Sequence, residues 1–201
     1  MTTVLLIRHG LTDAVGRLVA GRAVAASLNA EGQAQVASLV SRLARVPLAA
    51  VVSSPLARTR ETAEPIARTH DLPLELDDAF LEFDFGVWEG HAFASLDADP
   101  QWQRFNQARS LTAAPGGEWM LDVQRRAVGG LLRLRDRWAG QNVAVVSHGD
   151  VIRAAVMYAL GVPLEFVHRV EIAPARITVL QLGLDTVVVR QLNGDGLPPA
   201  L

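Results

Sequence analysis

The chain has 201 residues, half of them apolar, and a formal net charge of −2. All 19 of its permanent side-chain cations are arginines and it has no Cys, which excludes disulfide frameworks, thiol nucleophiles, Schiff-base lysines and Walker-A ATPases. Because positive and negative charges are nearly balanced, the composition does not indicate binding to nucleic acid or to a membrane surface. No apolar run approaches the ~18 residues of a membrane span. The apolar run at residues 4–7 is too short for a signal peptide, so we expect a soluble cytoplasmic protein with a single domain over residues 1–201.

The first third of the chain alternates short apolar runs with helical patterns. Asn29 stands where it can cap a helix whose apolar positions recur at helical spacing, and Pro55 stands at the favoured first position of the next helix. The patterns predict strands at residues 3–7, 49–52 and 73–76, and helices at 29–45 and 54–69.

The second half resumes this alternation after an irregular stretch. Residues 88–117 mix aromatic side chains, Gln and Arg with two prolines, and show no strand pattern, so we expect a partly helical insertion or lid there. The Gly129-Gly130 pair weakens the helix that follows, and the tail after Asn193 is rich in Gly and Pro and is expected to be loose. Further elements are predicted as helices at 118–138 and 150–160, a strand at 142–146, and a hairpin of 176–182 with 186–191.

Strands that alternate with helices indicate an α/β fold with a mostly parallel sheet covered on both faces. The closing hairpin adds an antiparallel edge. The sequence therefore predicts a three-layer α/β/α sandwich with an antiparallel edge hairpin and a partly helical insertion.

Chemically distinctive residues follow three of the predicted strands. Arg8-His9-Gly10 follows the first strand, Arg58 lies about one helical turn after the second, and His148-Gly149 follows the fourth. Because the carboxyl ends of parallel strands meet at one edge of a sheet, these side chains are expected to form a compact cationic pocket. Planar guanidinium groups grip oxygens in pairs, so such a pocket suits a phosphoryl group.

Six ordered motifs carry a resemblance to a known family. The chain resembles the histidine phosphatase superfamily, also called phosphoglycerate mutase-like, and its phosphatase branch in particular. The matching segments are LIRHGLT at 6–12, SLNAEGQAQ at 27–35, SSPLARTRETA at 53–63, LEFDFGVWEG at 81–90, PGGEWMLDVQRR at 115–126 and VVSHGDVIRA at 145–154.

The resemblance implies catalytic roles for five residues. His9 would be the nucleophile, Arg8 and Arg58 would bind the transferring oxygens, and His148 would donate a further hydrogen bond to them. Glu82 would protonate the leaving oxygen and then accept a proton from water, which requires a carboxyl still protonated near neutral pH. Asp84, two residues on, is the competing carboxylate if the segment is extended, and the family position favours Glu82.

Other residues are expected around the phosphate and the leaving group. The sequence departs from the family at Val15, where an Asn is common, and at Trp119, where Ser is common. The candidates for contact with phosphate or substrate are Thr12, Gly21, Arg22, Gly149, Trp102, Arg104 and Arg109.

The resemblance implies a phosphomonoester hydrolase that acts through a phosphohistidine on a small phosphorylated metabolite, with no metal and no cofactor. Alternatives within the family are a cofactor-dependent phosphoglycerate mutase and an alpha-ribazole phosphatase. Alternatives of other classes are a catalytically silent member that binds phosphoproteins and a metal hydrolase with His9, His148 and Glu82 as ligands. The sequence gives no sign of a nucleic-acid or membrane partner and leaves open whether the chain forms a homo-oligomer.

Overall fold

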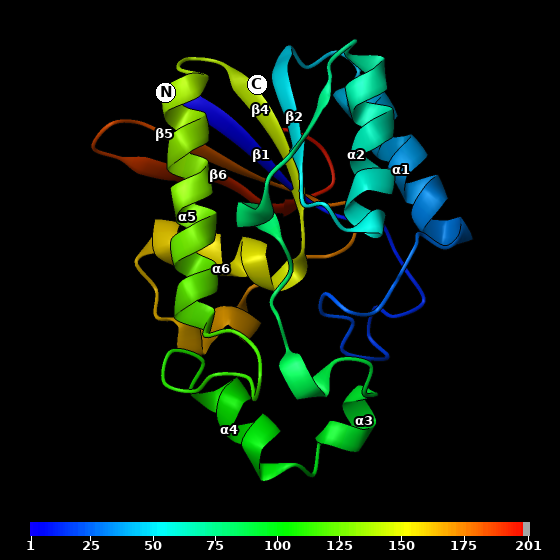
Figure 1. Ribbon diagram of the computed structural model, residues 1–201. Coiled ribbons are helices and arrows are strands. Elements are labelled where there is room, and N and C mark those ends of the chain that lie inside the picture. The colour runs from blue at the N-terminus through cyan, green and yellow to red at the C-terminus, as the bar shows by residue number, and fades with distance from the viewer. Residues whose placement is uncertain (199–201) are drawn as a thin grey trace.

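A six-stranded sheet in the order β3-β2-β4-β1-β5-β6 runs through the middle of the molecule (Figure 1). The structure is a computed structural model that describes residues 1–198, so the last three residues of the predicted domain lie outside it. The strands are β1 (Thr2–Arg8), β2 (Leu48–Ser53), β3 (Leu74–Leu76), β4 (Asn142–Ser147), β5 (Ile177–Leu182) and β6 (Val187–Gly194).

The four strands from β3 to β1 are parallel to one another, and the remaining two form the expected hairpin. β4 pairs in parallel with both β1 and β2, and β2 pairs in parallel with β3. β5 is antiparallel to β1 and to β6, which closes the sheet. The predicted mostly parallel sheet with an antiparallel edge hairpin is therefore confirmed.

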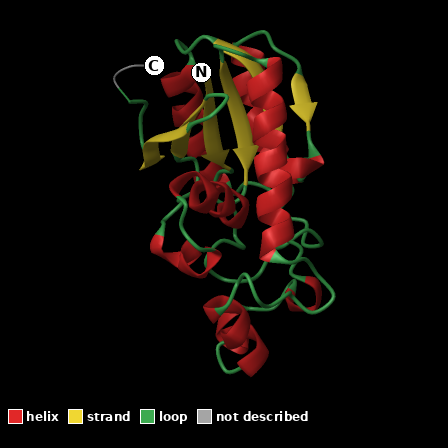
Figure 2. Cartoon of the chain, turned by 90° about the vertical axis from the view of Figure 1, so that its left-hand side faces the viewer, coloured by secondary structure: helices red, strands yellow, loops and turns green. Residues whose placement is uncertain are grey.

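Helices cover both faces of the sheet, as Figures 1 and 2 show. Alternate residues of β1 face different layers: Val4 and Leu6 belong to one core cluster, and Leu5 and Ile7 to the other. This is the pattern of a strand buried on both faces, and it accounts for the unbroken apolar run in the sequence. One layer consists of α1 (Ala30–Leu43) and α2 (Ala57–Thr69), and the other of α5 (Met120–Arg137) and α6 (Gly149–Leu160).

The helix starts agree with the sequence in one case and differ in the other. Asn29 caps α1, since its side-chain oxygen accepts a hydrogen bond from the Gly32 amide at 2.9 Å. α2, by contrast, begins at Ala57 and not at Ser54. The amide of Ser54 donates to the carbonyl of Val146 at 3.0 Å, so this residue still belongs to the sheet edge and Pro55 does not open the helix.

The insertion lies beyond the carboxyl ends of the parallel strands, at the bottom of Figure 1 and of Figure 2. The short helix η2 (Gly86–Trp88) leads into it, and it contains the short helices α3 (Phe93–Leu96) and α4 (Pro100–Gln107). Its own aromatic cluster holds it together: the ring of Trp88 lies 5.1 Å from those of Trp102 and Phe105, measured between centroids. The segment is therefore partly helical, as predicted.

The end of the described chain differs from the loose tail that we expected. β6 continues to Gly194, Asp195 pairs with Arg42 at 3.0 Å, and Leu197 packs against the cluster under α1. Along residues 1–198, no helix has the length and apolar character needed to cross a membrane.

The two adjacent glycines of α5 allow a matched test of the packing. A Cβ on Gly130 would lie 2.9 Å from atoms of Ala79 and of Phe80, whereas a Cβ on Gly129 would meet only the tip of Arg133 at 3.8 Å. We expect Gly130→Ala to lower the free energy of unfolding by about 1–3 kcal/mol through overpacking. Gly129→Ala should raise it by about 0.5–1 kcal/mol, because Ala favours the helix. Urea unfolding of both variants measures this, and changes of the same sign would contradict the packing argument.

Candidate active site

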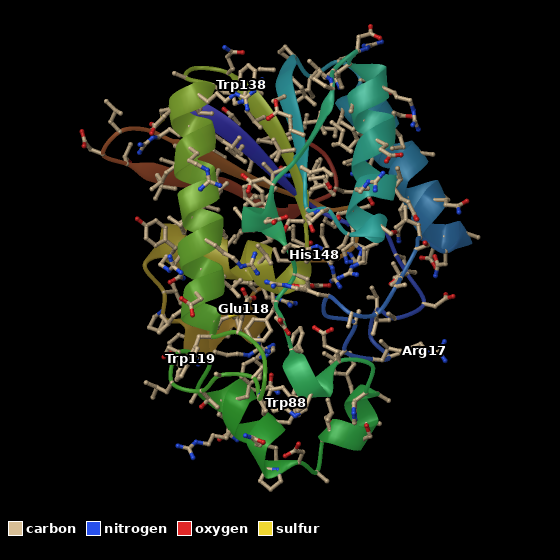
Figure 3. The ribbon with its side chains drawn as sticks, in the orientation of Figure 1. Arg17, Trp88, Glu118, Trp119, Trp138 and His148 are labelled. Carbon is tan, nitrogen blue, oxygen red and sulfur yellow. The ribbon has the colours of Figure 1, made fainter. Side chains whose placement is uncertain are left out.

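A cavity of about 130 Å³ opens at the carboxyl edge of the parallel strands. Four of the five predicted catalytic residues line it: Arg8, His9, Arg58 and Glu82. The fifth, His148, lies at the lower end of the sheet and above the insertion, far from Trp138 at the opposite end of the strands (Figure 3). The topology thus brings together residues that are up to 140 positions apart in the sequence.

The imidazole of His9 is held in one tautomer. Its Nδ1–H donates to the carbonyl of Gly10 at 2.7 Å, so Nε2 carries no proton in the neutral ring. Burial, helped by the positive charges of Arg58 and Arg8, holds the pKa of His9 well below its usual range. The ring is therefore neutral at pH 7, with a free lone pair on Nε2.

Two buried guanidinium groups flank this histidine. Arg8 donates to the carbonyl of Ile172 at 2.6 Å, and Arg58 donates to the carbonyl of Gly21 at 2.8 Å. The Nε of Arg8 and the hydroxyl of Thr12 are buried without a hydrogen-bond partner among residues 1–198. Because buried polar groups are nearly always paired, these donors are suited to an oxyanion bound in the cavity.

His148 is fully buried beside His9, with ring centroids 5.3 Å apart. Its Nε2 lies 2.8 Å from the hydroxyl of Ser54. Its Nδ1 is buried 3.8 Å from a carboxyl oxygen of Glu82 and has no hydrogen-bond partner in the described part of the chain. Burial and then the charge of Arg58 hold its pKa well below its usual range. If the Ser54 hydroxyl donates to Nε2, the single ring proton sits on Nδ1, where it is available to an anion.

Glu82 and Asp84 have different environments, which separates the two candidate acids. The side chain of Glu82 is 13% exposed and lines the cavity, and it accepts a hydrogen bond from the Phe83 amide at 2.9 Å. Burial and the negative charge of Asp150 raise its pKa to about 7. The side chain of Asp84 is 37% exposed and does not line the cavity. Glu82 is therefore the carboxyl placed to exchange a proton near neutral pH.

Sequence reasoning missed Asp150, the first acidic residue of α6. It lines the cavity and pairs with Arg109 at 3.2 Å and with Arg153 at 3.1 Å. Although burial alone would raise it, these two cations together with His168 lower the pKa of Asp150 to about 2. Asp150 thus supplies a permanent negative charge to the cavity. Its position in the HGD run was visible in the sequence, but its two partners were not.

Three of the predicted peripheral residues line the cavity and a fourth does not. Thr12, Gly21 and Gly149 contribute to its wall, as does Val15. Arg22 lies outside it: its guanidinium pairs with Glu118 at 2.7 Å and donates to the backbone carbonyl of Glu82 at 2.8 Å. Arg22, expected to contact phosphate or substrate, is thus placed outside the cavity lining, and its hydrogen bond holds the backbone of the segment that carries Glu82.

The insertion residues proposed to contact substrate have other roles. Trp102 is buried in the aromatic cluster and Arg104 is exposed on α4, and neither lines the cavity. Arg109 is buried, with its Cζ 4.3 Å from the centroid of the Phe105 ring, and it forms an ion pair with Asp150. Arg109 itself does not line the cavity. Trp119, the other departure from the family pattern, is 44% exposed at the start of α5 and lies away from the cavity. Packing therefore accounts for Trp102 and ion pairing for Arg109, whereas Arg104 and Trp119 are exposed outside the cavity lining.

Two further positioning residues give no clear signal in the sequence. The hydroxyl of Thr62 accepts from the amide of Gly10 at 3.0 Å and donates to the carbonyl of Arg58 at 2.8 Å, which ties the two sides of the cavity together. Glu89 accepts from the backbone amides of Arg22, Ala23 and Phe85. Both lie inside motifs already noted, but only their partners reveal what they do.

A search of residues 1–198 finds no cluster of three or more His, Asp or Glu side chains arranged to hold a metal ion. Independently, the guanidinium groups of Arg8 and Arg58 carry positive charge close to His9, His148 and Glu82. That charge opposes a cation at this position, which weighs against the metal-hydrolase alternative.

The fold and the residues at the sheet edge define an α/β protein whose cavity is built around a neutral histidine and two buried arginines. The chain belongs to the histidine phosphatase superfamily (branch 1), whose family pattern it matches over residues 4–195. The family membership expected from the six motifs is confirmed.

The chain is similar in sequence to relatives that are named for different activities. The bifunctional protein Rv2228c of Mycobacterium tuberculosis is 38% identical over 97% of this chain, which spans about half (54%) of that protein. Phosphoserine phosphatase 1 of Hydrogenobacter thermophilus is 32% identical over 82% of this chain and 79% of its own length, and the probable phosphoglycerate mutase GpmB of Escherichia fergusonii is 31% identical over 81% and 77%. Among solved structures, Bacillus stearothermophilus YhfR superposes with a TM-score of 0.89 at 31% identity, covering 97% of this chain and 98% of that one.

The environment of Glu82 gives a direct expectation for its titration. In carbon-13 NMR of labelled Glu side chains, Glu82 should titrate near pH 7, well above the usual value near 4.5. Asp150→Asn removes a negative charge that disfavours ionisation, so it should lower the pKa of Glu82. Asp84→Asn is the matched control and should leave it unchanged. A Glu82 that titrates near its usual value, or that does not respond to Asp150→Asn, would contradict this picture.

Proposed function

We propose that the chain is a phosphomonoester hydrolase that works through a phosphohistidine on His9. The observation that carries the proposal is the hydrogen bond from Nδ1 of His9 to the Gly10 carbonyl, which leaves Nε2 unprotonated between the two buried arginines. A neutral nitrogen with a fixed lone pair is the nucleophile that such a reaction needs.

In the first half-reaction, Nε2 of His9 attacks phosphorus while the bond from phosphorus to the ester oxygen breaks. Glu82 gives its proton to that oxygen, so that a neutral alcohol leaves. Hydrogen-bond donors stabilise the charge on the equatorial oxygens of phosphorus. These donors are the guanidinium groups of Arg8 and Arg58, the hydroxyl of Thr12 and Nδ1–H of His148. The pKa of Glu82, at about 7, keeps a substantial fraction of this carboxyl protonated at neutral pH.

In the second half-reaction, water attacks the phosphohistidine and the carboxylate of Glu82 takes its proton. The nitrogen–phosphorus bond breaks, inorganic phosphate leaves and His9 returns to its neutral form. Every proton in this cycle is accounted for by Glu82, so no metal and no cofactor take part. Activity is expected to withstand EDTA and to be inhibited by vanadate, which resembles the trigonal-bipyramidal phosphorus.

Hydrolysis is favoured over phosphoryl return to a phosphoglycerate. A mutase has to retain an acidic intermediate, which calls for cations beyond the two that hold the phosphoryl group. Arg104 and Arg109, the arginines of the insertion, lie outside the cavity lining, and the third arginine of the lining, Arg153, is paired with Asp150. A relative named as a phosphoglycerate mutase makes a parallel mutase assay necessary.

His9→Ala should abolish turnover of every phosphomonoester, because no other side chain in the cavity offers an unprotonated nitrogen to phosphorus. Rapid quenching of the native protein with labelled substrate should yield an acid-labile, base-stable label on His9. A His70→Ala protein, altered at the far end of α2, should be labelled as before. Turnover that persists in His9→Ala, or label on another residue, would sink the mechanism.

Glu82→Gln should slow hydrolysis most for substrates with poor leaving groups, since only these need a proton on the departing oxygen. We expect kcat to fall by about 10²–10⁴-fold with an alkyl phosphate and far less with p-nitrophenyl phosphate. An equal loss with both substrates would indicate a structural role for Glu82 instead.

A further inference from the structure

The cavity is lined by apolar side chains as well as by the polar groups proposed to bind phosphate. Its lining includes a group of apolar side chains, which we call the apolar wall: Val15, Leu18, Val19 and Phe93. Phe93 is 37% exposed although it is a large aromatic side chain. An exposed aromatic ring at the mouth of a cavity is a surface that a ligand can cover.

Backbone hydrogen bonds between two distant segments build this wall. The amide of Val19 donates to the carbonyl of His91 at 2.9 Å, and the amide of Gly90 donates back to the carbonyl of Val19 at 2.8 Å. The amide of Phe93 donates to the carbonyl of Arg17 at 3.1 Å. The loop after β1 and the start of the insertion are thereby joined like two short strands, which fixes Leu18, Val19 and Phe93 in one surface.

The charges around the cavity are already engaged. Of the three arginines that line it within residues 1–198, Arg8 and Arg58 are required for the phosphoryl oxygens. The third, Arg153, is bound through Nη1 to Asp150 at 3.1 Å and through Nε to the carbonyl of Val170 at 2.9 Å. Asp150 is shared with Arg109, but both hydrogen bonds of the Arg153 guanidinium go to oxygens of the protein, so this side chain already has its partners.

Two arginines of the loop after β1, Arg17 and Arg22, lie outside the cavity lining. Arg17 lines a separate hollow that also contains Asp13, and it lies to the side of His148 in Figure 3. Arg22 is held by Glu118. Among the described residues, each arginine of the cavity lining therefore already has a phosphate-binding role or an ion pair, and Arg17 lies outside that lining.

We propose that the apolar wall binds the alcohol part of the substrate, and that this alcohol is apolar and uncharged. The inference rests on the proposed hydrolase function and deepens it by naming the substrate class. An alkyl or aryl phosphate buries its carbon skeleton against Val15, Leu18 and Phe93. A phosphorylated hydroxy acid or amino acid would place its charges against the same surface without a partner, which is unfavourable.

The test compares esters that share a leaving oxygen and differ in charge. Butyl phosphate and 4-phosphonooxybutanoate are both esters of primary alcohols, and only the second carries a carboxylate. We expect kcat/KM for butyl phosphate to be about tenfold or more above that for 4-phosphonooxybutanoate, with O-phosphoserine poorer still. Equal values, or a preference for the carboxylated ester, would overturn the proposal.

Three variants locate the effect. Phe93→Ala and Leu18→Ala should lower kcat/KM for butyl phosphate about tenfold, mainly through KM, while methyl phosphate, too small to cover the wall, is hydrolysed as before. Equal losses for both esters would count against the wall. Arg17→Ala is the control on the outer side of the loop and should change neither ester. A selective loss with 4-phosphonooxybutanoate in Arg17→Ala would instead show that a cation reads the substrate's acid group.

The outcomes also separate the two proposals. Label on His9 together with a preference for the carboxylated ester would overturn the apolar wall alone. Failure to hydrolyse any of these esters, with no label on His9, would overturn the hydrolase function and the wall with it.

Discussion

The burial of two like charges next to a neutral histidine is the constraint around which this fold is arranged. Arg8 and Arg58 both lie close enough to His9 for their charges to depress its pKa. A buried cation without partners costs several kcal/mol, so each guanidinium needs a fixed acceptor. The acceptors are backbone carbonyls, Ile172 just before β5 for Arg8 and Gly21 in the loop after β1 for Arg58. The paths of both segments are thus set by the cations that they stabilise.

The same local field gives the titratable groups opposite protonation states at one pH. Burial and positive charge keep His9 and His148 neutral, whereas burial and Asp150 keep Glu82 partly protonated, with a pKa of about 7. Asp150, less than one turn into α6, remains ionised with a pKa of about 2 because Arg109 and Arg153 enclose it. Glu82 and Asp150 line the same cavity, but their different charged neighbours give them different pKa values and therefore different protonation states at neutral pH.

The sequence predicted those features that depend on local pattern. The apolar run of β1, the cap at Asn29 and the positions of His9 and His148 at strand ends all follow from periodicity and short-range chemistry. The features that it did not predict depend on contacts across the fold. Arg109 is drawn inward by Asp150, which lies 41 residues later.

The start of α2 illustrates the same limit. Ser54-Pro55 has the local signature of a helix start, yet Ser54 instead bonds to Val146 in the neighbouring strand and to the ring of His148. These tertiary contacts, which orient the imidazole of His148, thus override the local preference for a helix start at Ser54-Pro55. No pattern within residues 53–57 predicts these contacts, because the partner residues lie almost a hundred positions later in the sequence.

Glu89 joins the two sides of the cavity mouth in a manner that bears on how ligands enter. Its carboxylate accepts hydrogen bonds from the amides of Arg22 and Ala23 on one segment and from that of Phe85 on the other. Gly21 lies so close that a Cβ there would overlap this carboxylate, and its φ of +49° also favours glycine. Glu89 thus adds side-chain hydrogen bonds to the backbone hydrogen bonds that already join the loop after β1 to the start of the insertion. Moving either segment alone away from the cavity would break both sets of hydrogen bonds.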